Sequence, residues 1–495
     1  MPTMLSKSRV LAARQCPKRL WLEVNRPGLR VVSPDTQRRF DQGHRLNDVV
    51  HRLIPDGRLI APEVTLGTAL GITKRHLARS PDAPLFEATF SRHRVLVRAD
   101  VFERTGDAWR LTEVKSSTRV KPYHLDDCAV QAWVIGEAGY PVAETVLAHI
   151  DTDFVYRGDG NYRGLLKHQD VTEQIEARLP QVPGWVAEGL EALAGDEPAI
   201  AMGDQCTDPF ECPFLEHCSP EPVAYPVTRL PNRGRIVDQL LAEGIEDIRD
   251  IPPGRLTRPL HERVRLATVS GEPYIAEELA AILQGLPYPR HYLDFESIQF
   301  VVPVWPDTRP YEQLPFQWSC QIEENDGRLS EVPFLDLSGE PPMRGCAEKL
   351  LATLGAAGPV LTYSPFERQV IHGLARRFPD LRPALEAAAA RILDLLPLIR
   401  QHYYHPAMRG SFSIKAVLPT VAPHLSYADL GDVKDGTAAQ VAFEEAIAAD
   451  TPRARRDELR NALLKYCALD TLAMVETVRF LSTPKPFSSA QHIQP

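Results

Sequence analysis

The hydrophobic and polar residues follow three different patterns along the chain. Up to about residue 222, strand-like segments at 96–103 and 109–115 alternate with helical patterns. Residues 223–286 form short helical patterns, and the sequences Leu-Leu-Ala-Glu-Gly-Ile and Ile-Arg-Asp-Ile-Pro-Pro-Gly are typical of helix, turn and helix. From 287, a strand-like run at 288–295 precedes a strand at 360–363 and long helical patterns around 384–400 and 456–481. We therefore predict an α/β protein with domains at 1–222 and 287–482, a helical connector at 223–286 and a frayed tail at 483–495.

The composition is that of a folded protein, with 44% hydrophobic and 24% charged residues. A chain of 495 residues is too long for one ordinary domain, which agrees with the pattern. The sequence contains no uninterrupted apolar run of about 18 residues. Its first residues lack the apolar core and cleavage site of a signal peptide. We therefore expect a cytoplasmic protein without a membrane span.

The net charge of −9 argues against a uniformly basic surface that coats nucleic acid. The charge is uneven, however, because residues 1–58 carry twelve Lys and Arg against five Asp and Glu. This segment could contact phosphates, although a solvated basic surface explains it equally well.

A first group of polar residues falls on the two strands predicted near residue 100. Asp100 ends the apolar run Val-Leu-Val-Arg-Ala, and Glu113 and Lys115 lie two apart on the next strand, hence on one face. Two carboxylates from adjacent strands can chelate Mg²⁺ or Mn²⁺, and a neighbouring lysine can orient the attacking water. Taken alone, Glu-X-Lys is also common as a solvated ion pair.

With Gln131 on the helix that follows, this arrangement resembles the PD-(D/E)XK nucleases of the RecB family over roughly residues 5–222. The resemblance implies a restriction-endonuclease-like fold. It also implies that Asp100, Glu113, Lys115 and Gln131 are catalytic and that Asp100 and Glu113 bind metal. Many members carry a metal-binding His four residues after a Gly in an N-terminal helix. Here Gly43 is followed at that spacing by Asn47, with His44 and His51 nearby, so the departure leaves a weakened centre as an alternative.

Four cysteines form a second group. Cys206, Cys212 and Cys218 follow one another at regular short spacing, and Cys16 lies far upstream. Four thiolates complete a tetrahedral shell for zinc or for a [4Fe–4S] cluster, and the spacing does not separate the two. The RecB-like family that includes the CRISPR adaptation nuclease has a similar order, one Cys ahead of the nuclease domain and three behind. That resemblance favours a structural [4Fe–4S] cluster, with zinc as the alternative, although relatives usually have a tighter Cys-x2-Cys pair.

A third group of acids spans the C-terminal region. Asp294 and Glu296 lie on one face of the predicted strand at 288–295. Tyr466 and Asp470 are four residues apart in a helical pattern and therefore neighbours on one helix face. Between them, Val-Leu-Thr-Tyr-Ser-Pro-Phe predicts a strand, a turn and a helix start that presents Glu367.

These parts resemble the DEDD exonucleases of the DnaQ-like, RNase H-fold superfamily over about residues 288–482. The resemblance implies that Asp294, Glu296, Glu367 and Asp470 bind metal and that Tyr466 orients the attacking water. The third acid is Glu rather than the commoner Asp, and Asp394 competes for that role, although the lead-in to Glu367 fits better. Gly-Ser-Phe-Ser-Ile-Lys at 410–415 is a candidate substrate contact or a packed turn.

The whole arrangement resembles a bacterial family that fuses these two nuclease domains. We therefore expect a Mg²⁺- or Mn²⁺-dependent nuclease, an exonuclease by its C-terminal resemblance, that hydrolyses DNA by two-metal catalysis in repair, recombination or defence. One alternative is a nucleic-acid-binding or assembly protein with one decayed centre. Another is an RNA-processing exonuclease, because enzymes of the DEDD kind act on either sugar.

Overall fold

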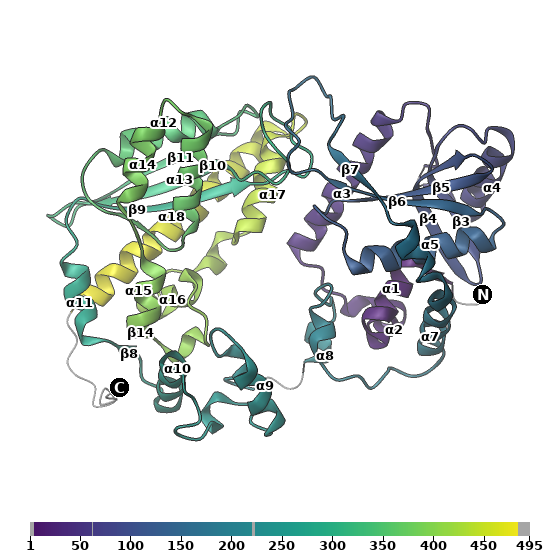
Figure 1. Cartoon of the computed structure of the whole chain (residues 1–495). Coiled ribbons are helices and arrows are strands. Elements are labelled where there is room, and N and C mark those ends of the chain that lie inside the picture. The colour runs from purple at the N-terminus through teal and green to yellow at the C-terminus, as the bar shows by residue number, and fades with distance from the viewer. Residues whose placement is uncertain (1–3, 62, 220–222, 484–495) are drawn as a thin grey trace. The chain divides into compact units, whose positions relative to one another are not determined.

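The computed structural model describes residues 4–61, 63–219 and 223–483, which form two compact units (Figure 1). The first unit contains the chain up to Ser219 together with Phe300–Glu312. The second contains Pro220–Gln299 and the chain from Gln313 onward. Each unit has one large sheet covered by helices, which confirms the α/β class.

The sheet of the first unit contains antiparallel and parallel strand pairs. β3, β4 and β5 form an antiparallel meander, and β5 continues to β6 by a parallel pairing across α5. The short β1 pairs with β4 in parallel, so that the following helix starts beside β4. The strands are β1 (Leu5–Ser6), β2 (Arg58–Leu59), β3 (Leu85–Arg92), β4 (Val95–Thr105), β5 (Ala108–Lys115), β6 (Val142–Ile150) and β7 (Leu166–Asp170).

Helices pack on both faces of this sheet. Apolar residues of α1, α5 and α7 share one core with β3 and β4, whereas Leu46, Val49 and Val50 of α3 belong to a second core with Phe86 and Val101. The strands therefore bury apolar side chains on two sides. The helices are α1 (Lys7–Gln15), α2 (Pro17–Asn25), α3 (Pro34–Leu53), α4 (Leu66–Arg79), α5 (Pro122–Glu137), α6 (Thr172–Glu176), α7 (Val182–Ala194) and α8 (Leu215–Cys218).

The segment 300–312 lies in the chain between β9 and β10 but packs in the first unit. The Tyr162 hydroxyl donates a hydrogen bond of 3.0 Å to the Pro303 carbonyl. The Tyr311 hydroxyl donates to the Ser116 carbonyl, directly after β5. The sequence pattern gave no indication that the chain returns to the first unit here.

The second unit is built on a five-stranded sheet of order β11-β10-β9-β12-β13. The pairings of β9, β10 and β11 are antiparallel, and those of β9, β12 and β13 are parallel. Gln317 pairs with Glu296 and Ser319 with Asp294, so these four residues lie on one face of the sheet. The strands are β9 (Arg290–Ile298), β10 (Leu314–Glu323), β11 (Leu329–Leu335), β12 (Val360–Thr362) and β13 (Ile392–Asp394), with a separate pair β8 (Tyr274–Ile275) and β14 (Tyr403–Tyr404).

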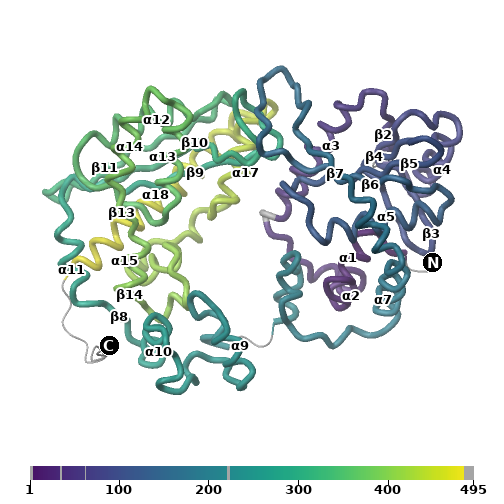
Figure 2. Tube along the Cα trace, in the orientation of Figure 1, coloured from purple at the N-terminus to yellow at the C-terminus, as the bar shows by residue number. Residues whose placement is uncertain are grey.

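The long helix α18, yellow in Figures 1 and 2, runs along β9 and β10. Gln317 donates to the Leu463 carbonyl at 2.7 Å, and the Ser319 and Thr471 hydroxyls are 3.0 Å apart. The face that carries Asp294 and Glu296 is therefore the face that α18 covers. The helices are α9 (Arg235–Ala242), α10 (Pro259–Ser270), α11 (Glu277–Gln284), α12 (Met343–Leu354), α13 (Phe366–Arg377), α14 (Arg382–Ala390), α15 (Leu395–His402), α16 (Ile414–Val421), α17 (Gly436–Ile447) and α18 (Arg453–Ser482).

Two helical expectations differ from the structure. The pattern at 384–400 is not one helix, because Ile392–Asp394 forms β13 beside β12 and Asp394 then caps α15. In the connector, residues 248–250 form only a 3₁₀ turn, and α10 begins at Pro259. Residues of 223–286 share one hydrophobic core with Leu395, Tyr403 and the end of α18.

The expected tail, apart from Thr483, lies outside the described residues. Among the helices of the described residues, none is both long enough and apolar enough to cross a bilayer.

Candidate metal centres

The second unit gathers three carboxylates between β9 and α18. Asp294, Glu296 and Asp470 each place an oxygen so that the three atoms lie within 4.8 Å of one another. Glu296 and Asp470 are buried, and Asp294 is partly buried. The two-residue spacing on the strand and the cross-packed helix bring these acids together. Oxygen ligands at this separation suit Mg²⁺ or Mn²⁺.

Glu367 comes from a neighbouring element. It is the second residue of α13, the helix that follows β12 after three residues, and is buried. The Ser364 hydroxyl donates to its Oε2 at 3.1 Å. Asp394 instead accepts a hydrogen bond of 2.9 Å from the Leu396 backbone and caps α15. The negative charge of Glu367 contributes to raising the pKa values of both Asp294 and Glu296.

Burial raises the pKa values of all four acids. Burial, followed by the charges of Asp470 and Glu296, raises the pKa of Asp294 well above its ordinary value. Burial and then Asp470 raise the pKa of Glu296 to about 8. Burial raises the pKa of Glu367 to about 7 and also raises that of Asp470. Without a cation, the centre therefore holds protons near neutral pH.

Two tyrosines and a lysine surround the C-terminal acids. Tyr466 lies one helical turn before Asp470 and is buried. Tyr427, which the sequence did not single out, donates a hydrogen bond of 2.6 Å to Asp470 Oδ1. Lys415 Nζ donates to the Tyr466 hydroxyl at 3.3 Å and lies over the Tyr427 ring, 5.1 Å from its centroid. The end of the segment 410–415 thus reaches the centre.

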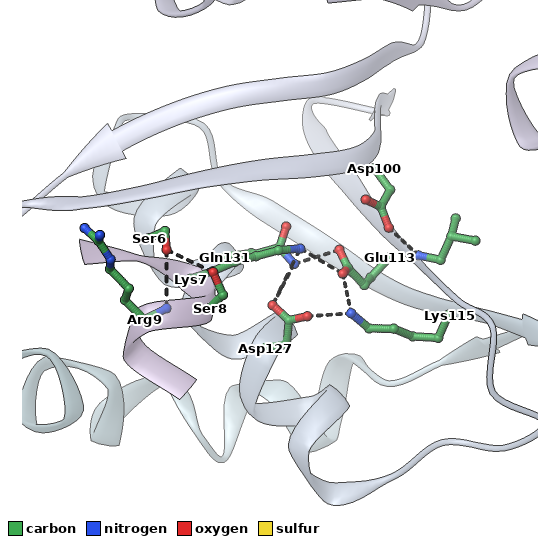
Figure 3. Close-up of polar contacts among 10 residues, drawn as sticks. Ser6, Lys7, Ser8, Arg9, Asp100, Glu113, Lys115, Asp127 and Gln131 are labelled. Atoms are coloured by element: carbon green, nitrogen blue, oxygen red, sulfur yellow. Dashed lines mark hydrogen bonds and ion pairs between the residues drawn. The ribbon is translucent and has the colours of Figure 1, made fainter. Parts of the chain in front are cut away.

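The first unit contains a tightly bonded network around Glu113 (Figure 3). Lys115 Nζ donates to Glu113 Oε1 and to Asp127 Oδ2, both at 2.6 Å. Gln131 Nε2 donates to Glu113 Oε2 at 2.7 Å. Lys7, the first residue of α1, donates to Glu113 Oε1 at 2.8 Å. The predicted Glu113, Lys115 and Gln131 therefore meet, together with two residues that were not predicted.

Asp100 lies beside this network without an ion pair to it among the described residues. Its Oδ2 accepts a hydrogen bond of 2.7 Å from the Val114 backbone, between Glu113 and Lys115 (Figure 3). Burial and then the Glu113 charge raise the pKa of Asp100 to about 7. Burial also acts to raise the pKa of Glu113, but the ammonium groups of Lys115 and Lys7 outweigh it and hold that pKa far below its usual range.

The helix α3 carries the departure from the nuclease pattern. Asn47 holds the place of the usual His, and the His51 ring lies against Phe86 with centroids 4.3 Å apart. A further acid, Glu87, lies on β3 between Phe86 and Ala88, which pair with Val101 and Ala99 of β4, and has a left-handed φ of 56°. Burial raises the pKa of Glu87, and Lys7 and Arg98 oppose this, as does His44 more weakly.

The four predicted cysteines line one pocket of the first unit. The Cys212 backbone donates to the Cys206 carbonyl at 2.8 Å. Gln15, next to Cys16, donates from its amide to the Gln205 and Phe210 carbonyls, both at 2.7 Å. No three sulfurs of the described cysteines lie within 4.8 Å of one another.

Sequence analysis missed Lys7, Asp127 and Tyr427. Asp127 was within reach of prediction, because it precedes Gln131 by four residues on α5. Lys7 and Tyr427 carry no such signal, since only the tertiary structure brings them to Glu113 and Asp470.

A sequence profile for a domain of unknown function (DUF2779) matches residues 291–413. This range includes Asp294, Glu296 and Glu367 but ends before Tyr427 and α18. No curated protein matches the chain.

Proposed function

We propose that the chain is a metal-dependent nuclease whose main centre consists of Asp294, Glu296 and Asp470, with Glu367 as the fourth acid. The observation that carries this proposal is the approach of three carboxylates within 4.8 Å of one another. None of the four acids forms an ion pair within the described residues. Their mutual repulsion is relieved when divalent cations bind, and the same cations hold a phosphate.

The topology of the second unit supports an RNase H-like fold of the DEDD exonuclease kind. Asp294 and Glu296 lie on the central strand of the sheet, where an antiparallel meander meets a parallel extension. Glu367 starts the helix after β12, and Tyr466 and Asp470 share one face of α18. The acids thus follow one another along the chain in the order that the resemblance implies.

Bound Mg²⁺ or Mn²⁺ would supply Lewis-acid activation of water and neutralise charge on the phosphate. The chain's own residues would orient the attacking water. Tyr466 offers a phenol to the attacking water, and Lys415 brings a positive charge beside that phenol. One water adds to phosphorus, the bond from phosphorus to the leaving oxygen breaks, and the water's proton ends on that oxygen. No covalent enzyme intermediate is required.

The network around Glu113 favours a second nuclease centre of the restriction-endonuclease-like, RecB type. Glu113 and Lys115 project from β5 and meet Gln131 of α5, as that resemblance implies (Figure 3). Gln131 Oε1 is buried without a hydrogen-bond partner among the described residues, which fits a site that receives a further donor, such as metal-bound water. Asp100 and Glu113 would hold the ion.

The cysteine pocket fits a structural [4Fe–4S] cluster held by Cys16, Cys206, Cys212 and Cys218, with zinc as the alternative. Such a group would join the start of α2 to a loop about 190 residues later. It would fix the basic N-terminal segment beside the nuclease centre of the first unit.

We place this activity on DNA in preference to RNA, in the cytoplasm, and in repair, recombination or defence. The test is incubation of the purified full chain with matched fluorescent DNA and RNA oligonucleotides, single- and double-stranded, in Mg²⁺, Mn²⁺ or EDTA. We expect cleavage of DNA in either metal and none in EDTA. Faster cleavage of the RNA would favour the RNA-processing alternative. Binding without any cleavage would favour the nucleic-acid-binding alternative and contradict the proposal.

A further inference from the structure

The two centres differ in the positive charge that the chain itself supplies. In the first unit, Glu113 and Asp127 are each bonded to lysine, and Lys7 Nζ reaches both, at 2.8 Å from Glu113 Oε1 and 3.6 Å from Asp127 Oδ1. In the second unit, Lys415 contacts Tyr466 rather than an acid. The first centre therefore contains two ammonium groups bonded to its acids. In the second centre, none of the four acids forms an ion pair among the described residues.

The position of Lys7 is determined by the fold. Leu5 and Ser6 pair with Val95 and Leu96 of β4, and Lys7 then begins α1. Lys7 thus enters the centre from the side of β4, the strand that also carries Asp100. Its side chain is 24% exposed, and its ammonium group is bonded to acids.

Both carboxylate oxygens of Glu113 accept hydrogen bonds in this arrangement. Its Oε1 accepts from Lys7 and Lys115, and its Oε2 accepts from Gln131. A divalent ion on Glu113 must share that carboxylate with these donors. A second divalent ion would lie against two ammonium groups, and repulsion between like charges at such distances in a buried site is strong. The electrostatics therefore accommodate one ion at Asp100 and Glu113, with Asp127 still paired to the lysines.

We propose that Lys7 is a further catalytic residue of the first centre, a fixed cation in the place that a second divalent ion takes in two-metal nucleases. Lys7 then contacts the scissile phosphate and stabilises its negative charge, while Lys115 serves the attacking water. It acts by charge and exchanges no proton. The inference rests on the proposed nuclease function of this centre, but it concerns the number of ions that the centre binds, which is measurable without turnover.

The first measurement counts bound Mn²⁺ by electron paramagnetic resonance on the full chain with Asp294→Asn and Glu296→Gln, which silence the second centre. The ions of interest are those lost when Glu113→Gln is added. We expect one such ion per chain. Two ions with Lys7 intact would overturn the proposal, and this count does not require any change at Lys7.

The second measurement adds Lys7→Met, Lys7→Arg or, as the matched control, Lys74→Met on the exposed surface of α4. Removing the positive charge should tighten Mn²⁺ binding about tenfold or admit a second ion, because repulsion is lost. It should also lower DNA cleavage about 100-fold. Lys7→Arg should retain one ion and most of the cleavage, and Lys74→Met should change neither property.

The sign of the change separates this role from a structural one. If Lys7 only holds Glu113 in place, Lys7→Met loosens the carboxylate and weakens Mn²⁺ binding, which would contradict the proposal. A third outcome separates this assignment from the proposed function: the silenced chain binds one ion, Lys7→Met tightens Mn²⁺ binding, and no variant cleaves nucleic acid. The assignment of Lys7 as a fixed cation would then stand, and the nuclease function of this centre would fail.

Discussion

Tyr427 donates a hydrogen bond of 2.6 Å to Oδ1 of Asp470, although the two residues lie 43 positions apart. The bond fixes the orientation of a carboxylate that also approaches Asp294 and Glu296 within 4.8 Å. Partners of this kind orient metal ligands and are often as important as the ligands themselves.

Tyr427→Phe should therefore weaken Mn²⁺ binding at the C-terminal centre about 10- to 100-fold. The measurement is a Mn²⁺ titration of a chain in which Glu113→Gln silences the first centre. Tyr403→Phe is the matched control, because it removes a buried hydroxyl that bonds Thr420 at 2.8 Å, away from the acids. Equal affinities for the two variants would show that the Tyr427 bond does not position a ligand.

Stability of the metal-free protein should fall as pH rises. Glu296 has an ordinary pKa of 4.5 and a pKa of about 8 in the folded chain, so between these values the folded state binds more protons than the unfolded state. The free energy of unfolding therefore decreases from roughly pH 5 to pH 8. In EDTA we expect the melting temperature of the second unit to drop by several degrees over this window.

Mg²⁺ should reduce this dependence, because the cation replaces the protons. Glu296→Gln should flatten the curve in EDTA, since the amide does not titrate. A melting temperature in EDTA that rises across the same window would contradict the charge distribution of the centre.

A basic cleft at the start of α18 should contribute to nucleic-acid binding. It has a volume of about 430 Å³ and is lined by Arg453, Arg456 and Arg460, with Asp336 and Asp457. It lies near the acids, because the adjoining Leu335 pairs with Gln317, which pairs with Glu296. Arg453 and Arg460 form no ion pair within the described residues.

The double variant Arg453→Ala/Arg460→Ala should weaken binding of single-stranded DNA in Ca²⁺ about tenfold. The slope of log affinity against log salt should become shallower by about 1.4, as for two lost phosphate contacts. Arg455→Ala is the control on the same helix, since Arg455 is already bonded to Glu445 and Glu458. An unchanged slope in the double variant would exclude the cleft from the binding surface.

Cys16→Ser should remove the bound iron and, with it, absorbance at about 400 nm in protein purified without oxygen. The melting temperature of the first unit should fall by several degrees, because a bound cluster contributes folding free energy. Cys128→Ala on α5 is the control, because Cys128 lies outside the pocket that the four cysteines line. A colourless wild-type protein that contains zinc would contradict the iron–sulfur assignment.

Local spacing made part of this site predictable. A two-residue spacing placed Asp294 with Glu296, and a four-residue spacing placed Tyr466 with Asp470, because strand and helix periods determine which side chains share a face. Lys7 and Tyr427 were not predictable, since tertiary packing alone brings α1 to Glu113 and residue 427 to Asp470. The return of residues 300–312 to the first unit has the same origin. The helix expected at 384–400 failed because pairing with β12 outweighs the helical propensity around Ile392.

The most direct test of the central claim compares DNA cleavage by chains with Asp294→Asn, with Glu113→Gln and with both changes, in Mn²⁺ at fixed salt. The proposed C-terminal centre predicts that Asp294→Asn in the Glu113→Gln background lowers the rate of DNA cleavage at least 100-fold. The variant should stay folded at the assay temperature, which a melting curve in Mn²⁺-free buffer checks. Equal cleavage by the Glu113→Gln chain and by the doubly changed chain would contradict it.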